Sequence, residues 1–195
     1  MDEMKFYKWA LSATVIAALA AAGSADKCAA PDGTPCIYVN GILAEQNPFV
    51  VLSDDAPKVA LLSTDPNATI WYSLDDIPPL GGFLYAGPFD LPDIAFLQAI
   101  AVGTNGNVSQ TAYRSILRFP AEFVAPNHLA IVLRDASAVS FIMRGTANRR
   151  YVLERSMNLG TWMPITSTIA PQDGVARMKD SNPPTGQAFY RAVEK

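Results

Sequence analysis

The chain has 195 residues, a length that suits one large domain or two small ones. Half of its residues are hydrophobic, which is enough to bury a core, and its formal net charge is −3 at pH 7. A mildly acidic chain without a basic run lacks the electrostatic footprint of a nucleic-acid-binding protein. It also lacks the polybasic patch that holds proteins on anionic membranes. We therefore expect no nucleic acid among its partners.

Residues 1–25 have the pattern of a secretory signal peptide. Residues 9–22 are almost entirely apolar, but they are too few to span about 30 Å of hydrocarbon, which takes about 20 residues. Two lysines precede this run and small residues follow it, which predicts cleavage after Ala25 or Ala22. Two acidic residues offset the lysines, so an uncleaved membrane anchor remains the alternative. We expect a secreted, cell-surface or periplasmic protein with no membrane span in the mature chain.

An N-terminal segment, residues 26–56, follows and contains the two cysteines of the chain, Cys28 and Cys36. Between them lies Pro31-Asp-Gly33, a turn sequence that would bring the thiols together. In an exported chain an even number of cysteines favours a disulfide. Farther on, the pair Asn40-Gly41 predicts a tight hairpin turn.

Short β-type runs separated by turn residues then occupy residues 57–118, and no stretch has helical periodicity. Turn signals between them include Pro78-Pro79, Gly81-Gly82 and Asn105-Gly106. This pattern predicts a β-sandwich rather than a parallel α/β sheet. The strands that we expect are Lys58–Leu62, Thr69–Leu74, Phe89–Leu91, Phe96–Val102 and Thr111–Arg118.

A proline-containing stretch, residues 119–127, is the predicted linker to a second β series at residues 128–195. Alternation is clear in this series, because Val139, Phe141 and Met143 share one face of their strand. We expect a second sandwich of immunoglobulin-like or fibronectin-like type, so the fold class is all-β with two tandem modules. Its expected strands are His128–Leu133, Ala138–Met143, Tyr151–Arg155, Thr161–Ile165, Val175–Lys179 and Ala188–Val193.

Four motifs in the first series resemble successive signatures of one family. They are Val59-Ala-Leu-Leu-Ser63, Ala68-Thr-Ile-Trp-Tyr-Ser-Leu-Asp75, Leu84-Tyr-Ala-Gly-Pro88 and Leu97-Gln-Ala-Ile-Ala-Val102. Together they resemble the chitobiase/β-hexosaminidase C-terminal type module, also called fibronectin type III-associated. The resemblance implies an immunoglobulin-like sandwich that serves exported enzymes and surface proteins as a spacer or accessory domain. The family usually closes its first hairpin with Asp-Gly, whereas Asp75 is followed here by Asp76, so we expect the turn to differ locally.

A second resemblance covers about residues 128–194. It is carried by Phe141-Ile-Met-Arg-Gly145, Tyr151-Val-Leu-Glu-Arg-Ser156, Leu159-Gly-Thr-Trp162, Asp180 and Phe189-Tyr-Arg191. This pattern is similar to a short β module of exported proteins from verrucomicrobial and planctomycete-type bacteria. The resemblance implies no chemistry. We expect Trp162 to anchor the core of this module.

The residue inventory predicts no catalytic residues, no metal site and no cofactor. His128 is the only histidine, and the chain has no Gly-x-Ser-x-Gly elbow, zinc-type Cys/His cluster or phosphate-binding glycine loop. Neighbouring carboxylates such as Asp54-Asp55 and Asp75-Asp76 raise the possibility of calcium, but no Asp-x-Asp-x-Asp-Gly loop accompanies them. We read them as turn residues and His128 as a structural or solvent-facing side chain.

Trp71 is the candidate binding residue. On the expected strand Thr69–Leu74, Ile70 and Leu74 mark the core face, which places Trp71 with Ser73 on the opposite face. A flat, partly exposed indole suits a sugar ring or a partner surface. The alternative is that neighbouring loops or the second module cover it.

We expect a non-catalytic exported protein that acts by binding or assembly, with a glycan or an envelope protein as partner. Carbohydrate binding through Trp71 is its more specific form. The alternative is a structural subunit of a cell-surface layer, fibre or envelope complex. Edge strands could join such subunits by self-assembly, and residues 26–56 are long enough to donate a strand.

Overall fold

A computed structural model describes residues 28, 30, 32–75, 77–134 and 137–195. The predicted signal peptide lies outside the described residues. Contact clustering divides the chain into two compact units. Within the described residues, unit 1 comprises the chain up to Phe49 together with Asp55–Leu117, and unit 2 comprises Val50–Asp54 together with Arg118–Lys195. The chain therefore enters unit 2 briefly before it completes unit 1.

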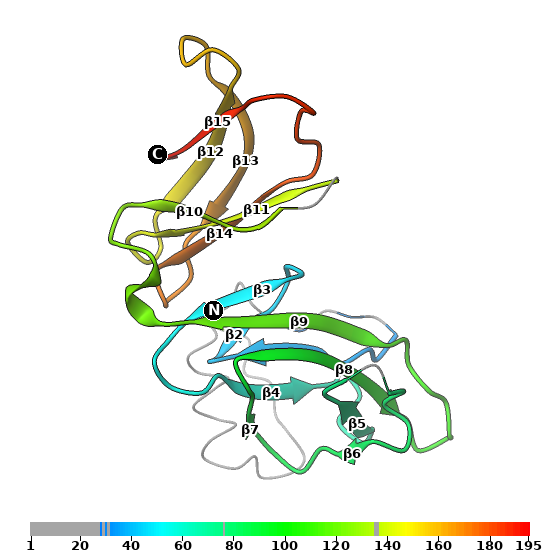
Figure 1. Cartoon of the computed structure of the whole chain (residues 1–195). Coiled ribbons are helices and arrows are strands. Elements are labelled where there is room, and N and C mark those ends of the chain that lie inside the picture. The colour runs from blue at the N-terminus through cyan, green and yellow to red at the C-terminus, as the bar shows by residue number, and fades with distance from the viewer. Residues whose placement is uncertain (1–27, 29, 31, 76, 135–136) are drawn as a thin grey trace, which may run out of the picture. The chain divides into compact units, whose positions relative to one another are not determined.

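The described chain is all-β apart from one short 3-10 helix, as the sequence predicts. Its strands are β1 (Cys36–Val39), β2 (Ile42–Leu43), β3 (Phe49–Leu52), β4 (Lys58–Leu62), β5 (Thr69–Ser73), β6 (Phe83–Leu84), β7 (Phe89–Asp90), β8 (Ile94–Val102), β9 (Ala112–Phe119), β10 (Leu129–Arg134), β11 (Val139–Arg144), β12 (Arg150–Ser156), β13 (Met163–Ile169), β14 (Val175–Asp180) and β15 (Phe189–Glu194) (Figure 1). The helix η1 (Ala121–Phe123) follows β9. No helix among these residues is long and apolar enough to cross a membrane.

Unit 1 is a sandwich of two antiparallel sheets. One sheet has the strand order β2-β1-β4-β7, and the other has the order β3-β9-β8-β5-β6, with β3 at the boundary between the units. Alternate residues of each strand point inward, so Val59 and Leu61 of β4 and Leu97 and Ala99 of β8 are almost completely buried.

Aromatic rings close the gap between the last strands of the two sheets. Tyr72 of β5 stacks on Phe89 of β7 with ring centroids 4.3 Å apart, and Tyr85 meets both rings edge-on. Tyr85 therefore packs against both rings at this corner of unit 1.

The hairpin between β1 and β2 follows from its turn sequence. Asn40 and Gly41 have φ values of 50° and 80°, the pair of positive values that a type I′ turn requires. Val39 pairs with Ile42 directly across this turn. The predicted tight turn is confirmed.

Unit 2 also consists of two antiparallel sheets, with the strand orders β10-β11-β14 and β13-β12-β15. Phe141 of one sheet meets Tyr190 of the other with ring centroids 4.6 Å apart. The core between the sheets contains Val139, Phe141, Met143, Tyr151, Leu153, Ala170, Ala176 and Met178.

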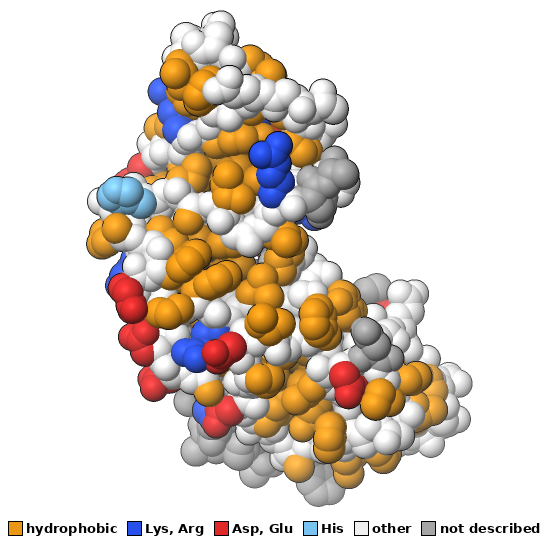
Figure 2. Space-filling model, in the orientation of Figure 1, with side chains coloured by type: hydrophobic (Ala, Val, Ile, Leu, Met, Phe, Trp, Pro, Cys, Tyr) orange, Lys and Arg blue, Asp and Glu red, His pale blue; other side chains and the backbone are white. Residues whose placement is uncertain are grey.

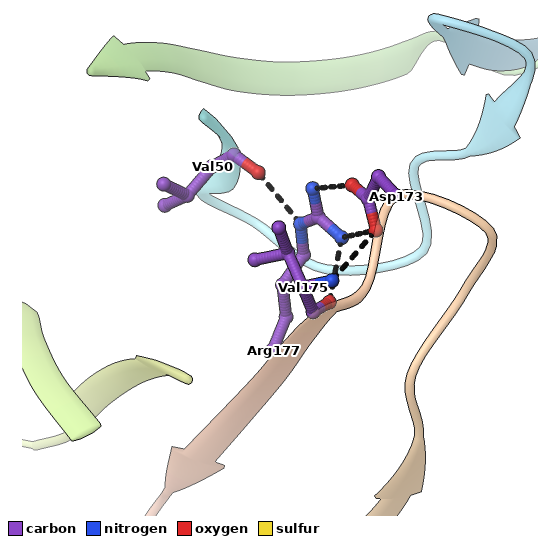
Figure 3. A network of polar contacts seen from close by, with 4 residues as sticks. All are labelled: Val50, Asp173, Val175 and Arg177. Carbon is purple, nitrogen blue, oxygen red and sulfur yellow. Dashed lines mark hydrogen bonds and ion pairs between the residues drawn. The ribbon is translucent and has the colours of Figure 1, made fainter. Parts of the chain in front are cut away.

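The outer face of the β10-β11-β14 sheet is covered as well. Ile142 is 1% exposed although its side chain faces away from the core of unit 2. Its neighbour on β14, Arg177, donates from Nε to the carbonyl oxygen of Val50 at 2.6 Å (Figure 3). The segment Val50–Asp54 therefore lies on this face and contributes to the fold of unit 2.

The stretch expected as a linker, residues 119–127, belongs to unit 2. It contains η1, whose Phe123 stacks on Phe119 at 4.3 Å between centroids. Its backbone is tied to neighbouring segments, because the N–H of Ala121 donates to Asp54 Oδ1 and the N–H of Asn127 donates to the carbonyl oxygen of Arg144.

Candidate binding face

The candidate site is the outer face of the five-stranded sheet in unit 1. Pairing sets which side chains share this face, because residues directly opposite each other on antiparallel strands point to the same side. Trp71 lies opposite Ile100 on β8 and opposite Leu84 on β6. The face, called the outer face below, consists of Trp71, Ser73, Leu84, Ile94, Phe96, Gln98, Ile100, Tyr113 and Ser115.

Large apolar side chains on the outer face reach solvent. Ile94 is 61% exposed, Leu84 is 55%, Phe96 is 45% and Tyr113 is 37%, and Trp71 is half-buried. Ile100 in their midst is only 4% exposed. The centre of the outer face is therefore buried, and solvent-exposed aromatic and aliphatic side chains surround it.

Polar side chains lie between the apolar ones and are fixed by hydrogen bonds. The Oγ of Ser73 donates to the carbonyl oxygen of Ile77 at 2.6 Å, and Gln98 Nε2 donates to that of Asp75 at 3.2 Å. The hydroxyl groups of Tyr113 and Ser115 lie 3.1 Å apart. These bonds anchor the loop after β5 beside the face and orient the Tyr113 ring.

The register separates the three aromatic side chains of the face. Trp71 and Tyr113 lie on strands two apart, with β8 between them, which is about 10 Å across the sheet. Phe96 lies diagonally from Tyr113, because Gln98 is the residue opposite Tyr113. Such a spread of flat rings with amides and hydroxyls between them can stack on the apolar faces of successive sugar units and hydrogen-bond their hydroxyl groups.

Hydrophobic side chains reach the surface widely in this protein, as Figure 2 shows for one face of the molecule. In unit 1 a second exposed apolar set lies in the loop that precedes β6 and in β6 itself. Ile77, Leu80 and Phe83 are each about 60% exposed. Exposure alone therefore does not single out the outer face; its alternation of aromatic and polar groups does.

The two cysteines form a disulfide, as predicted. Cys28 and Cys36 have Cα atoms 5.6 Å apart. The Oγ of Ser63 donates to the carbonyl oxygen of Gly33, and Thr64 Oγ1 donates to that of Ala30, so the disulfide loop is held against the end of β4.

The sequence prediction for Trp162 is wrong. Trp162 is half-buried and does not belong to the core of unit 2. The guanidinium of Arg191 lies 4.2 Å from the centroid of its ring, and Arg191 in turn pairs with Glu154 at 2.7 Å. The fully buried aromatic anchors of unit 2 are Tyr151 and Phe141.

Titratable side chains are engaged in structural contacts. His128 is exposed, and its Nδ1 lies 2.9 Å from the carbonyl oxygen of Pro126. Burial and a hydrogen bond to Asp180 raise the pKa of Tyr190, and burial raises that of Tyr85. Burial lowers the pKa of Arg114, whose guanidinium donates to the carbonyl oxygen of Ala44.

No group of three or more His, Cys, Asp or Glu side chains suited to a metal ion occurs among the residues that the structure describes. An open polar pocket of about 320 Å³ lies in unit 1 beside the disulfide loop, lined by residues that include Asp65, Asn105 and Asn107. Oδ1 of Asp65 accepts the N–H of Asn67, and Oδ1 of Asn105 accepts that of Asn107. These side chains stabilise turns.

Comparison with known proteins identifies part of the chain. Residues 59–116 match the family model described as Fn3 associated. No curated protein sequence matches the chain. We confirm the sequence prediction that a fibronectin type III-associated module occupies this stretch, whereas the resemblance of residues 128–194 to a second module stays a prediction.

Several solved structures align with the chain at low identity and low TM-score. They include the apo structure of Bacteroides uniformis beta-glucuronidase 3 (TM-score 0.37, 11% identity, 83% of this chain and 24% of that chain) and Parabacteroides merdae beta-glucuronidase (TM-score 0.33, 11% identity, 83% and 24%). The D00-D0 domain of Intimin has a TM-score of 0.29 at 13% identity, over 81% of this chain and 98% of that chain. The chain thus spans about a quarter of the length of the β-glucuronidase chains. Residues 59–116 of this all-β chain are a fibronectin type III-associated module.

Proposed function

We propose that this is an exported, non-catalytic protein whose fibronectin type III-associated module binds polysaccharide through the outer face. The observation that carries the proposal is the arrangement of Trp71, Phe96 and Tyr113 on one sheet surface, with Gln98 between them. Stacking on aromatic rings is a way to hold a ligand that is polar at its edge and apolar on its face.

Export is supported by two independent features. Residues 1–25 have the pattern of a signal peptide, and the Cys28–Cys36 disulfide is of a kind that persists in oxidising compartments. An accessory module of an exported protein would act outside the cytoplasm, at the cell surface or in the medium, where polysaccharides are the abundant polymers.

The test of binding is retention on a panel of insoluble polysaccharides, with Phe96→Ala as the diagnostic variant. Phe96 is 45% exposed, so its loss should leave the fold intact and weaken binding about tenfold. The matched control is Phe123→Ala, because Phe123 is 46% exposed and belongs to unit 2 rather than to the outer face. The control should bind like the unaltered protein. Equal losses in both variants, or no retention on any polysaccharide, would contradict the proposal.

The same material tests the absence of catalysis. Incubation of the purified protein with each polysaccharide should release no soluble sugar above the level of a buffer control. Steady release that scales with protein concentration would overturn the non-catalytic part of the proposal.

The alternative function is a structural subunit joined through sheet edges, and strand β10 favours it. This edge strand presents Ile131 and Leu133, which are 55% and 41% exposed. Its pairing with β11 is irregular between these two residues, and because such bulges protect edge strands from further pairing, this feature counts against the alternative. The N-terminal segment is not a free strand donor in this structure, because β1, β2 and β3 are all paired within the chain. Growth of particle size with concentration in light scattering, abolished by Ile131→Lys, would support the alternative.

A further inference from the structure

The loop between β12 and β13 in unit 2 forms an exposed apolar tip. Met157 is 56% exposed, Leu159 is 57% and Met163 is 52%. In Figure 1 this loop, drawn in gold, projects beyond the strands that it joins. We call residues 157–163 the β12–β13 tip.

Side-chain oxygens of Ser156 and Asn158 accept three backbone N–H groups of the tip. Oδ1 of Asn158 accepts the N–H groups of Gly160 and Thr161 at 2.9 and 3.0 Å. Oγ of Ser156 accepts the N–H of Asn158 at 3.2 Å. Because these donors are bonded within the turn, moving the tip out of water leaves them paired, which is the main requirement for irregular backbone in a lipid environment.

The backbone of Leu159 has an unfavourable conformation for a residue with a large side chain. Its φ is 63°, in the left-handed region that bulky residues rarely adopt. Asn or Gly would fit this position with less strain. A leucine held here, exposed and strained, points to a function for its side chain rather than to folding.

The charge pattern distinguishes the tip from the other exposed apolar loop. No Asp, Glu, Lys or Arg occurs from Ser156 to Ile165, whereas the loop of Ile77 and Leu80 begins at the acidic pair Asp75-Asp76. At the base of the tip stands Trp162, with the guanidinium of Arg191 over its ring and the carboxylate of Glu154 paired to that guanidinium. An uncharged apolar end above a tryptophan and an arginine follows the order of side chains found across a membrane interface.

We propose that the β12–β13 tip inserts into the interfacial layer of a lipid surface, with Met157 and Leu159 among the acyl chains and Trp162 at headgroup level. The occupant is lipid because the tip offers exposed apolar surface without a charged residue. Insertion of two side chains gives weak, reversible attachment. It is independent of polysaccharide binding, which the proposed function places on the other unit.

The test uses Trp162 as a local reporter in the full chain. Replacing Trp9 and Trp71 by Phe leaves Trp162 as the only indole. Vesicles of phosphatidylcholine should shift its fluorescence to shorter wavelength, and brominated phosphatidylcholine should quench it. The reporter responds to the tip itself, whatever other segment brings the protein to the vesicle.

The diagnostic variant is Leu159→Asn, because Asn suits the left-handed backbone and removes the apolar side chain. The lipid concentration for half-maximal quenching should rise about tenfold or more. Leu80→Asn is the matched control, since Leu80 is 60% exposed on the acidic loop, and it should leave the quenching curve unchanged. No spectral shift in the parent protein, or the same curve for Leu159→Asn, would overturn the proposal. So would self-association without lipid that Leu159→Asn abolishes, because the tip would then bind a second copy.

Discussion

Arg177 is a buried charged side chain that joins separate segments of unit 2. It is 5% exposed, pairs with Asp173 at 2.6 Å, and donates to the carbonyl oxygens of Val50 and Val175 (Figure 3). A buried charge that loses its partners is costly, and so are buried acceptors that lose their donor. Arg177 therefore holds the segment from Val50 onward against β14.

We predict that Arg177→Met lowers the free energy of unfolding by about 3 kcal/mol, because it leaves the carbonyl oxygen of Val50 without this donor and removes the cation that pairs with Asp173. Urea denaturation of the full chain measures this. Lys58→Met is the control, since the Lys58–Asp90 pair is exposed and should contribute less than about 1 kcal/mol. Similar losses in both variants would show that burial of the Arg177 network is unimportant.

Tyr190 makes stability depend on alkaline pH. Burial and the hydrogen bond from its hydroxyl to Asp180 raise its pKa, so the folded state holds the phenolic proton more tightly than the unfolded chain does. This contribution is complete below the unfolded pKa of about 10 and is lost as pH rises through the higher folded value.

We predict that the urea midpoint falls as pH rises above about 10 and that Tyr190→Phe makes this fall shallower. Tyr85, whose pKa burial also raises, accounts for part of the remaining slope. An unchanged slope in Tyr190→Phe would show that the phenol is free to ionise in the folded protein.

At the scale of elements, the disulfide loop is a local clamp on the start of β1. Cys28 and Cys36 are eight residues apart, and β1 pairs with β4 through Cys36 opposite Leu62. We predict that replacing both cysteines by Ser lowers the free energy of unfolding by about 2–3 kcal/mol, the loop-entropy cost for a closure of this length. Equal stability of the oxidised and the double-Ser proteins would contradict the clamp.

The strands that the sequence predicts agree with the structure to within a few residues because alternation and turn residues are local signals. Thr69–Leu74 was expected where β5 spans Thr69–Ser73, and the predicted face of Trp71 follows from the same alternation. The pairing of Trp71 with Leu84 was beyond prediction, because β6 has only two residues. Ile100 lies on β8, between β9 and β5. Its burial depends on how these three strands pair, and the sequence of a single segment does not show which strands pair.

Two other features were missed because they are non-local. Trp162 was expected in the core of its module, but the guanidinium of Arg191, from the distant strand β15, lies over its ring. Likewise, the sequence pattern predicts no strand at Phe49–Leu52, where β3 lies. Val50 of this strand accepts a hydrogen bond from Arg177 of β14. Val50 and Arg177 are 127 residues apart in the sequence, so the periodicity of a single segment cannot predict this contact.

At the scale of the whole molecule, unit 2 is discontinuous. The N–H of Ser53 donates to the carbonyl oxygen of Phe119, and Arg118 donates to the carbonyl oxygens of Ser53 and Asp54. The fibronectin type III-associated module, residues 59–116, is thus inserted between two parts of unit 2.

We predict that a fragment of residues 118–195 unfolds without a cooperative transition, because the buried guanidinium of Arg177 loses its acceptor on Val50. Fusing residues 49–55 to its N-terminus through a short glycine-serine linker should restore cooperative urea unfolding. A fragment that already folds cooperatively without the fusion would show that Val50–Asp54 is dispensable.

The proposed function of this protein depends on whether the outer face binds polysaccharide. The most direct measurement is the adsorption isotherm of the unaltered protein and of Trp71→Ala on whichever insoluble polysaccharide retains the protein. We predict a dissociation constant at least about tenfold higher for Trp71→Ala, with an unchanged urea midpoint for unit 2. Overlapping isotherms for the two proteins would contradict the central claim.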